Sequence, residues 1–293
     1  MRVLITGCYG QVGSSLTEQL AKDTNTEVLA LDRDSLDITN QKAVNAAVTE
    51  FKPTIIINAA AHTAVDKAEE EVELSYAINR DGPKYLAQAA QDVGAAILHI
   101  STDYVFEGNK VGEYVESDIT NPQGVYGNSK LAGEIAVSEA CSKHVILRTA
   151  WVFGENGNNF VKTMLRLGAA QDKLSIVGDQ YGGPTYAGDI ANALIQIAKR
   201  IEQGGAIEFG IYHFSGLPHV SWYEFAETIF DTAVRQGLIH KKPSLNSITT
   251  EKYPTPAKRP SSSRLCTDKI NNVFSIEASD WKMALNNIQA YTG

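Results

Sequence analysis

The chain has 293 residues, 43% of them hydrophobic and 20% charged, which is an ordinary globular composition with enough apolar residues for a full core. The formal net charge of −8 argues against nucleic-acid or anionic-membrane partners, and three scattered cysteines without a C-x-x-C pair argue against a disulfide framework or zinc cluster. No apolar run approaches the roughly 20 residues of a membrane span and the N-terminus does not resemble a signal peptide, so we expect a cytoplasmic protein.

The first predicted element is a buried strand, Arg2–Thr6, which is followed at once by a glycine-rich loop and a helix. The loop carries the pattern G-x-x-G-x-x-G at Gly7, Gly10 and Gly13. Gly7 permits the tight turn out of the strand, and Gly10 lets backbone amides approach a pyrophosphate. Gly13 lets the helix pack closely on the sheet, and the helix N-terminus favours an anion. This combination predicts a dinucleotide site.

The second predicted strand, Glu27–Asp32, ends in a carboxylate that lies 19 residues after Gly13. A carboxylate at about this distance holds the adenosine ribose hydroxyls, which favours NADH. Arg33 comes next and could hold a 2′-phosphate, so NADPH remains open as an alternative. The alternative for Asp32 is a solvated acid at the end of a strand.

The next segments continue the alternation of strands and helices. Asp37 and Ile38 could flank the adenine before a helix over residues 40–52. A strand over Thr54–Asn58 then leads to three alanines, which would let a flat ligand lie against the backbone. His62 follows the strand without a carboxylate partner placed by the sequence, so we do not expect it to be an acid or base catalyst.

The most informative stretch contains Thr102, Tyr126 and Lys130. A buried strand over Ala95–Ile100 would place Thr102 just past its C-terminal end, where open α/β sheets bind ligands. Tyr126 and Lys130 are four residues apart, so on a helix they share one face. A helix that carries Lys130 is predicted over 127–141. Y-x-x-x-K is also a common surface spacing, but a phenol beside an ammonium is a plausible proton donor to a developing alkoxide.

The rest of the first half completes the pattern. Helical periodicity runs from Val72 to Val93, with an acidic run at its start that we interpret as a solvated face. Another buried strand, His144–Thr149, leads to Trp151. The order of elements predicts a Rossmann-type α/β fold, a doubly wound parallel sheet over residues 1–150.

The second half predicts a smaller substrate-binding domain over residues 151–293, with segments at about 186–214 returning to the Rossmann sheet. Ser221 and Glu224 form a capping-box pattern at the start of a helix. A Pro/Ser-rich basic loop holds Arg259, and clustered cations there suit an anionic substrate. A solvated basic loop is the alternative.

Together these motifs resemble the extended short-chain dehydrogenase/reductase family. The resemblance covers essentially the whole chain and rests on GxxGQVG, INAAAHTAVDKAE, STDYVFEG, VYGNSKLAGE, RTAWVFG, NNFVKTMLRL, DQYGGPT and YPTPAKRPSSSRL. It is strongest to members that use NADPH or NADH to reduce the C4 ketone of a dTDP-bound 4-keto-6-deoxy sugar, dTDP-4-dehydro-β-L-rhamnose, to dTDP-L-rhamnose. The resemblance therefore implies a small nucleotide-sugar substrate.

The resemblance also implies roles for single residues. The cofactor would contact Gly7, Gly10, Gln11, Val12, Asp32, Arg33, Asp37, Ile38, Ala61, His62, Thr63, Tyr126 and Lys130. The substrate would contact Thr102, Asp103, Trp151 and Arg259. Tyr126 would protonate the C4 oxygen, Lys130 would bind the nicotinamide ribose and lower the pKa of Tyr126, and Thr102 would hydrogen-bond the ketone.

Tyr104 distinguishes this chain from related nucleotide-sugar dehydratases, which carry Thr-Asp-Glu where this chain has Thr102-Asp103-Tyr104. Without the glutamate the acid–base pair for dehydration is incomplete, which favours a reductase. Two other hypotheses remain open. One is a non-catalytic regulatory subunit like the family's methionine adenosyltransferase partner, and the other is an epimerase or dehydratase that holds NAD⁺ tightly. The retained Thr102, Tyr126 and Lys130 argue against the regulatory subunit.

The resemblance also raises the question of a metal. Some bacterial members are dimers bridged by Mg²⁺ through glutamates, and the matching positions here are Ser15 and Gly188. No acidic residue follows Asp280. Hard cations such as Mg²⁺ bind through several carboxylate oxygens, so we expect no bridging metal here. Without that bridge we expect a monomer or weak homodimer.

Overall fold

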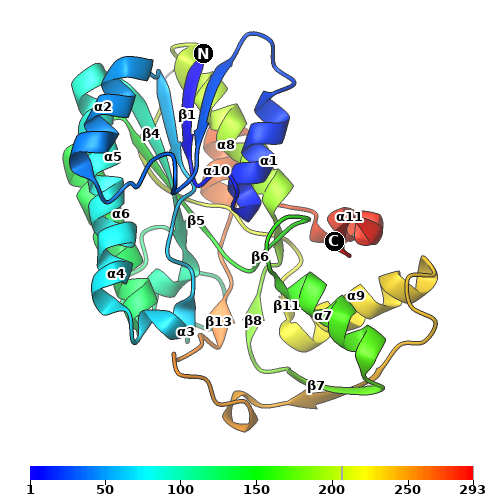
Figure 1. Ribbon diagram of the computed structural model, residues 1–293. Helices are drawn as coiled ribbons and strands as arrows, with labels where there is room; N and C mark the ends of the chain where they lie inside the picture. Colours follow the sequence, from blue (N-terminus) through cyan, green and yellow to red (C-terminus); the bar gives the residue numbers. More distant parts are fainter. Residues whose placement is uncertain (206, 293) are drawn as a thin grey trace.

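In the part of the chain that the computed structural model describes, residues 1–205 and 207–292, six parallel strands form the main sheet in the order β10-β5-β4-β3-β1-β2 (Figure 1). These strands are β1 (Arg2–Thr6), β2 (Glu27–Leu31), β3 (Ile55–Asn58), β4 (Ala96–Thr102), β5 (His144–Thr149) and β10 (Gly210–His213). The predicted α/β class with a parallel sheet is confirmed.

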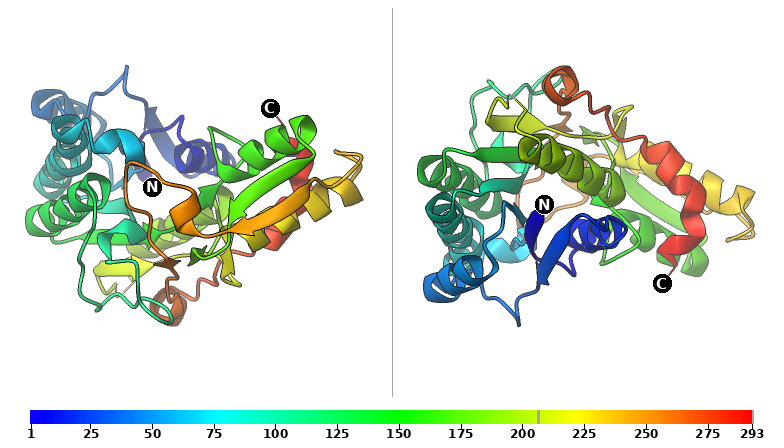
Figure 2. Two further views of the ribbon diagram at one scale, coloured as in Figure 1. Left: turned by 90° about the horizontal axis from the view of Figure 1, so that it is seen from below. Right: turned by 90° about the horizontal axis from the view of Figure 1, so that it is seen from above.

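Both faces of this sheet are covered by helices, as its sequence requires. Helices α1 (Gln11–Leu20), α8 (Ala187–Glu202) and α10 (Asp268–Phe274) lie on one face, and α2 (Gln41–Phe51), α5 (Gly82–Val93) and α6 (Val125–Ala140) lie on the other (Figures 1 and 2). Alternate strand residues enter opposite cores: Val3 and Ile5 pack towards α1 and α8, whereas Leu4 packs towards α2 and α5. This two-sided burial explains the continuous apolar runs of the strands.

The helix predicted from Val72 to Val93 is interrupted. It consists of α4 (Val72–Tyr76), a π-helical turn η1 over Ala77–Asp81, and then α5. The wide turn brings the Asn79 backbone against α6, where a Cβ on Gly133 would lie 2.0 Å from the Asn79 carbonyl oxygen. Periodicity does not reveal such a turn, which is common at functional sites. A second small correction concerns Thr102, which is the last residue of β4 and not just past it.

The smaller lobe has its own core. Helices α7 (Phe160–Ala170) and α9 (Trp222–Arg235) pack with β7 (Lys173–Val177), β12 (Ser244–Ile248) and α11 (Trp281–Ala284) around buried aromatic side chains such as Phe225. The predicted capping box at the start of α9 is present, with Ser221 and Glu224 bonded reciprocally.

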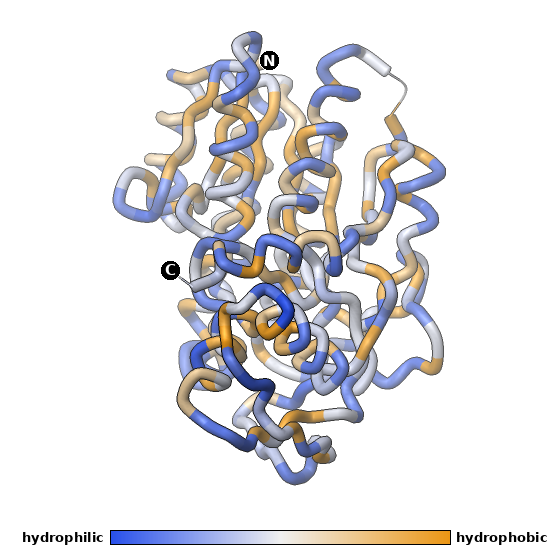
Figure 3. Tube along the Cα trace, turned by 90° about the vertical axis from the view of Figure 1, so that its right-hand side faces the viewer, coloured by the Kyte–Doolittle hydropathy of each residue, from blue (hydrophilic) through white to orange (hydrophobic). Residues whose placement is uncertain are grey.

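Short strands connect the lobes: β6 (Val152–Phe153), β8 (Tyr181–Gly182), β9 (Thr185–Tyr186), β11 (Val220–Ser221) and β13 (Ser262–Ser263). The order in one small sheet is β11-β8-β13. Hydrophobic and hydrophilic residues alternate along the coiled segments of the trace, and many of the outer loops are hydrophilic (Figure 3). None of the helices in the described part of the chain is long and apolar enough to cross a bilayer.

Candidate active site

A cavity of about 990 Å³ is lined by residues of both lobes and includes the C-terminal ends of β3, β4 and β5. Its wall brings together eleven of the residues singled out from the sequence: Gly10, Gln11, Val12, Ala61, Thr63, Thr102, Asp103, Tyr126, Lys130, Trp151 and Arg259. The other six, which do not line it, are Gly7, Asp32, Arg33, Asp37, Ile38 and His62. The cavity lies at the edge of a parallel sheet where ligands of such folds bind.

The glycine loop has the close packing that its sequence predicts. Gly7 has φ +72°, and a Cβ there would lie 2.7 Å from the backbone nitrogen of Ala60. A Cβ on Gly13 would lie 2.0 Å from the carbonyl oxygen of Gly7. Gly10 is the N-cap of α1 and makes no side-chain capping bond, so the first amides of the helix are open to an anion. The loop therefore fits the pyrophosphate of a dinucleotide.

Two of the acidic residues that follow β2, Asp32 and Asp37, were predicted to contact the cofactor. Asp32 accepts a hydrogen bond from the Ser35 amide at 2.9 Å, and hydrogen bonds from Ser35 lower the pKa of Asp32. Hydrogen bonds from Thr39, aided by the charge of Arg33, lower the pKa of Asp37. Both acids are therefore ionised at neutral pH, as a carboxylate that accepts ribose hydroxyls must be.

Two of the predicted cofactor residues direct their side chains elsewhere. Ile38 is 6% exposed, and its side chain packs in the core beneath α2 and α5. The imidazole of His62 lies 2.9 Å from the Ser75 hydroxyl and 3.1 Å from the Glu71 carboxylate. The sequence placed no carboxylate beside His62, yet Glu71 of the acidic run does reach it, and the run is not simply a solvated face.

Tyr126 and Lys130 occupy the first two turns of α6 and face the end of β4. The Lys130 ammonium donates to the carbonyl oxygen of Ile100 at 2.7 Å, and burial lowers the pKa of Lys130 to about 8. Burial also raises the pKa of Tyr126, and a hydrogen bond with Thr102 opposes that rise. Desolvation outweighs this hydrogen bond, so the net shift of the pKa is upward, and a lowering contribution from Lys130, which the resemblance implies, stays a prediction. The phenol consequently keeps its proton at neutral pH, as a proton donor must.

Arg259 reaches the cavity from the Pro/Ser-rich loop. Its guanidinium donates to Asp66 at 2.5 Å and to the Tyr104 hydroxyl at 3.3 Å. Burial raises the pKa of Tyr104 to about 12, so this phenol is neutral. The Tyr104 ring meets Tyr126 edge-on, with 5.4 Å between ring centroids. The Arg259 guanidinium is thus held on the wall of the cavity by Asp66 and Tyr104, and it is not part of a freely solvated loop.

Trp151 forms an aromatic wall with a residue that the sequence analysis missed. Its ring stacks on Trp222, with centroids 3.5 Å apart and planes inclined by 12°. A Cβ on Gly182 would lie 2.6 Å from the Trp151 ring. The backbone of Trp151 is left-handed, at φ +50°, which costs about 1–3 kcal/mol and persists only where the surroundings impose it. Such strain is typical of ligand sites.

Two buried networks that the sequence did not reveal lie beside the candidate catalytic residues. The Asn79 side chain donates to the Ser129 hydroxyl at 3.0 Å and to the His62 carbonyl oxygen at 3.1 Å, which links η1 to α6. Arg148 donates to both carboxylate oxygens of Glu134, at 2.9 and 2.6 Å. Both side chains of this ion pair are 2% exposed.

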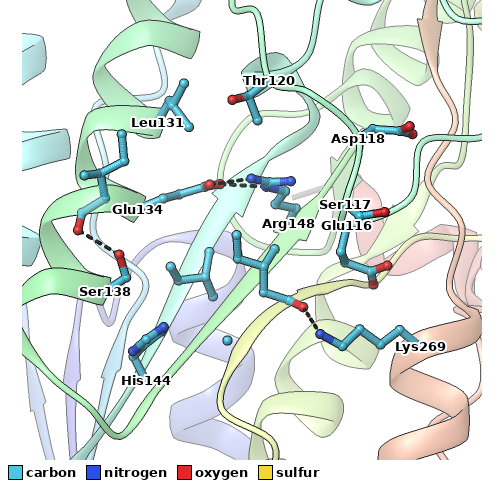
Figure 4. A pocket seen from close by; sticks show the side chains of 14 residues that line it. Glu116, Ser117, Asp118, Thr120, Leu131, Glu134, Ser138, His144, Arg148 and Lys269 are labelled. Atoms are coloured by element: carbon cyan, nitrogen blue, oxygen red, sulfur yellow. Dashed lines mark hydrogen bonds and ion pairs between the residues drawn. The ribbon is translucent and has the colours of Figure 1, made fainter.

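The Arg148–Glu134 pair lies in a second hollow, of about 700 Å³, between α6 and residues 116–120 (Figure 4). Ser101, next to Thr102, also donates to Glu134, at 2.5 Å, so the pair anchors the end of β4. Acidic and basic side chains both line this hollow. Across the described residues, no group of three or more His, Cys, Asp or Glu side chains is placed to hold a metal ion.

The doubly wound sheet, the glycine loop and the Thr102–Tyr126–Lys130 group define a Rossmann-type oxidoreductase of the short-chain dehydrogenase/reductase class. A family model described as RmlD substrate binding domain matches residues 1–292. The chain therefore belongs to the RmlD family of dTDP-4-dehydrorhamnose reductases, which confirms the resemblance predicted from its motifs.

Individual relatives agree with this assignment. A dTDP-4-dehydrorhamnose reductase from Aggregatibacter actinomycetemcomitans is 55% identical over 290 residues, covering 99% of both chains. A crystal structure of such a reductase from Clostridium acetobutylicum matches with a TM-score of 0.89 and 44% identity, covering 98% of both chains. The Bacillus anthracis reductase in complex with NADP also has a TM-score of 0.89, at 40% identity, and the match covers 98% of this chain and 97% of that one.

Proposed function

We propose that this protein reduces the C4 ketone of dTDP-4-dehydro-β-L-rhamnose to give dTDP-L-rhamnose, with NADPH or NADH as the reductant. The observation that carries the proposal is that Thr102, Tyr126 and Lys130 share one cavity wall with the start of α1. The activity named for the relatives supports the same reaction. In line with the composition, we further propose a cytoplasmic enzyme that is a monomer or weak homodimer.

The residues of the chain divide the work of the reduction. When bound, the coenzyme supplies the hydride that reduces the ketone carbon. Tyr126 donates its proton to the C4 oxygen, which becomes far more basic than a phenolate as the carbonyl is reduced. Thr102 hydrogen-bonds the same oxygen, and donors of this kind stabilise charge that develops there. Lys130, whose pKa of about 8 keeps it mainly protonated at pH 7, holds the nicotinamide ribose and adds positive charge.

The substrate and coenzyme phosphates would be held at different places. The amides at the start of α1 suit the coenzyme pyrophosphate, and Arg259 suits the diphosphate of the nucleotide sugar. Asp103 and Trp151 line the space between them and would contact the sugar. Asp32 favours NADH and Arg33 favours NADPH, and since both stand at the end of β2 we propose that the enzyme accepts both coenzymes.

The test is loss of NADPH or NADH absorbance with enzymatically generated dTDP-4-keto-L-rhamnose, with and without EDTA. Rapid oxidation by the native protein, most of it lost in Tyr126→Phe, is expected, with coenzyme affinity nearly unchanged in the variant. Activity that survives EDTA would support a metal-independent reaction. No oxidation by protein that still binds a coenzyme would refute the proposal and favour a non-catalytic regulatory protein. Unchanged turnover in Tyr126→Phe would refute the tyrosine as donor.

A further inference from the structure

Residues 257–266, here called the strap, connect the smaller lobe to the sheet lobe. The strap contains β13, which pairs with β8 of the small sheet (Figure 1). Other hydrogen bonds of the strap are with the sheet lobe. The Ser262 amide donates to the Gly108 carbonyl oxygen at 2.9 Å, and the Tyr114 amide donates to the Arg264 carbonyl oxygen at 2.7 Å. The strap is therefore held by both lobes at once.

One side chain of the strap reaches the catalytic centre. The Ser263 hydroxyl donates to Asp103 Oδ2, and the Thr102 hydroxyl donates to Asp103 Oδ1 at 3.1 Å. The Tyr104 amide in turn donates to Thr102 Oγ1 at 3.2 Å. Ser263 is 1% exposed and Asp103 and Thr102 are each 5% exposed, so bulk water does not replace these bonds. A continuous chain thus runs from the strap through Asp103 to the catalytic threonine.

The hydroxyl hydrogen of Thr102 is needed both by Asp103 and by the substrate ketone, and the bond from Ser263 to Asp103 makes the exchange possible. A hydroxyl has one hydrogen, and the Thr102 hydroxyl already has both Asp103 and Tyr126 as hydrogen-bond partners. To hydrogen-bond the substrate ketone, Thr102 must turn that hydrogen away from the carboxylate. A buried polar group that loses its donors is costly, and a charged carboxylate more so. The bond from Ser263 remains when Thr102 turns, and it keeps Asp103 satisfied and in place.

We propose that Ser263 is a positioning residue for the reduction: it holds Asp103 so that Thr102 can present its hydroxyl to the ketone, and the catalytic centre is complete only when the strap is seated. This inference rests on the proposed function. Ser263 does not touch the reacting atoms and acts through Asp103. The strap thereby links the position of the smaller lobe to the competence of the centre.

The protonation of Asp103 gives the proposal a signature in pH. Burial raises the pKa of Asp103 to about 6, and hydrogen bonds from Ser263 and Thr102 oppose that rise. The groups that face it are the phenols of Tyr104 and Tyr126, both of which feel its charge, with Arg259 beyond Tyr104. Once protonated, Asp103 no longer accepts from both hydroxyls, so turnover falls as pH falls through about 6. Loss of the Ser263 hydroxyl raises this pKa and moves the acid limb to higher pH.

The experiment compares Ser263→Ala with Ser262→Ala as the matched control. Ser262 is the neighbouring residue of β13, and its hydroxyl accepts from Arg264 Nε at 3.1 Å instead of reaching Asp103. For each protein, kcat, KM for the nucleotide sugar and the isotope effect with 4-deuterated NADPH are measured from acid to alkaline pH, on both sides of the Asp103 pKa of about 6. The pH dependence of kcat reports the essential acid and base of the enzyme with its substrate bound. Ser263→Cys keeps the size with a weaker donor and serves if the alanine variant does not fold.

We expect Ser263→Ala to lower kcat about 10-fold to 100-fold, with KM changed less than about 3-fold, a larger isotope effect and an acid limb at higher pH. Ser262→Ala should leave the acid limb in place. In an Asp103→Asn background, Ser263→Ala should cost little more, since it acts through that carboxylate. Equal effects of the two serine variants with an unmoved acid limb would overturn the proposal. Absence of reductase activity in the native protein would instead overturn the proposed function.

Discussion

Asp103 is expected to lower the stability of the fold at neutral pH. Its pKa is raised from 3.8 to about 6 because the carboxyl is buried. At about 1.4 kcal/mol per pH unit, this difference corresponds to about 3 kcal/mol of unfavourable free energy once the group is ionised in the fold. For a carboxyl with a raised pKa the penalty is absent well below pH 3.8 and is complete above about pH 6. Stability therefore declines across that interval as pH rises.

Asp103→Asn removes the charge and keeps the shape. We expect the free energy of unfolding of the variant, relative to the native protein, to improve by about 2 kcal/mol between about pH 4.5 and about pH 8. Some of the gain at the higher pH will be offset by weaker hydrogen bonds from Ser263 and Thr102. Urea denaturation at the two pH values measures the difference. Turnover should fall at the same time, because an amide does not replace the carboxylate that orients Thr102.

Asp37→Asn is the control, since the pKa of Asp37 is lowered and the sign of its effect is reversed. Its carboxylate stabilises the fold above its unfolded pKa and loses that contribution as pH falls. The control variant should therefore be at a greater disadvantage at the higher pH than at the lower one. If Asp103→Asn were no better relative to the native protein at the higher pH than at the lower, the raised pKa of Asp103 would be refuted.

Five further substitutions, in three experiments, test other parts of the site. Arg148→Met should destabilise the fold by about 3–5 kcal/mol in urea denaturation, because it leaves the Glu134 carboxylate buried without its cation. Adding Glu134→Leu should recover part of the lost stability, because it removes the unpaired charge. If stability did not recover in the double variant, the unpaired Glu134 charge would not be the cause of the loss. Gly13→Ala should weaken NADPH binding at least about 10-fold by fluorescence titration, since its Cβ would lie 2.0 Å from a backbone carbonyl oxygen, and unchanged affinity would mean that the loop does not hold the coenzyme. Arg33→Ala should lower the ratio of kcat/KM for NADPH to that for NADH, and Asp32→Asn should raise it; unchanged ratios would place coenzyme selection elsewhere.

The sequence predicts the sheet lobe well because its information is local. Apolar runs predict β1 to β5. The glycine loop predicts the start of α1, and the Y-x-x-x-K spacing predicts the helix that carries Tyr126 and Lys130. The π-helical turn at Ala77–Asp81 was missed because it keeps the apolar periodicity on both sides. It is specified instead by close packing against Gly133, which lies on another helix.

The parts of the site that sequence reasoning missed depend on distant pairs. Ser263 and Asp103 are 160 residues apart, and Arg259 and Asp66 are 193 apart. No local pattern specifies such contacts, since they arise only when the strap crosses from one lobe to the other. The net shift in the pKa of Tyr126 also depends on the whole fold. The sequence shows a cation four residues away, but burial is a property of the whole fold, and burial has the larger effect.

The structure gives a physical reason why Tyr104 suits a reductase. A glutamate at this position would add a second carboxylate beside Asp103 and could act as the base that an elimination requires. The phenol of Tyr104, with a pKa of about 12, stays neutral and accepts a hydrogen bond from Arg259 instead. That bond helps to keep a cation on the cavity wall, and Tyr126 stays the proposed proton donor to the ketone oxygen. A neutral tyrosine in place of an ionisable glutamate therefore removes the second acid–base group that dehydration requires. Carbonyl reduction does not require that group.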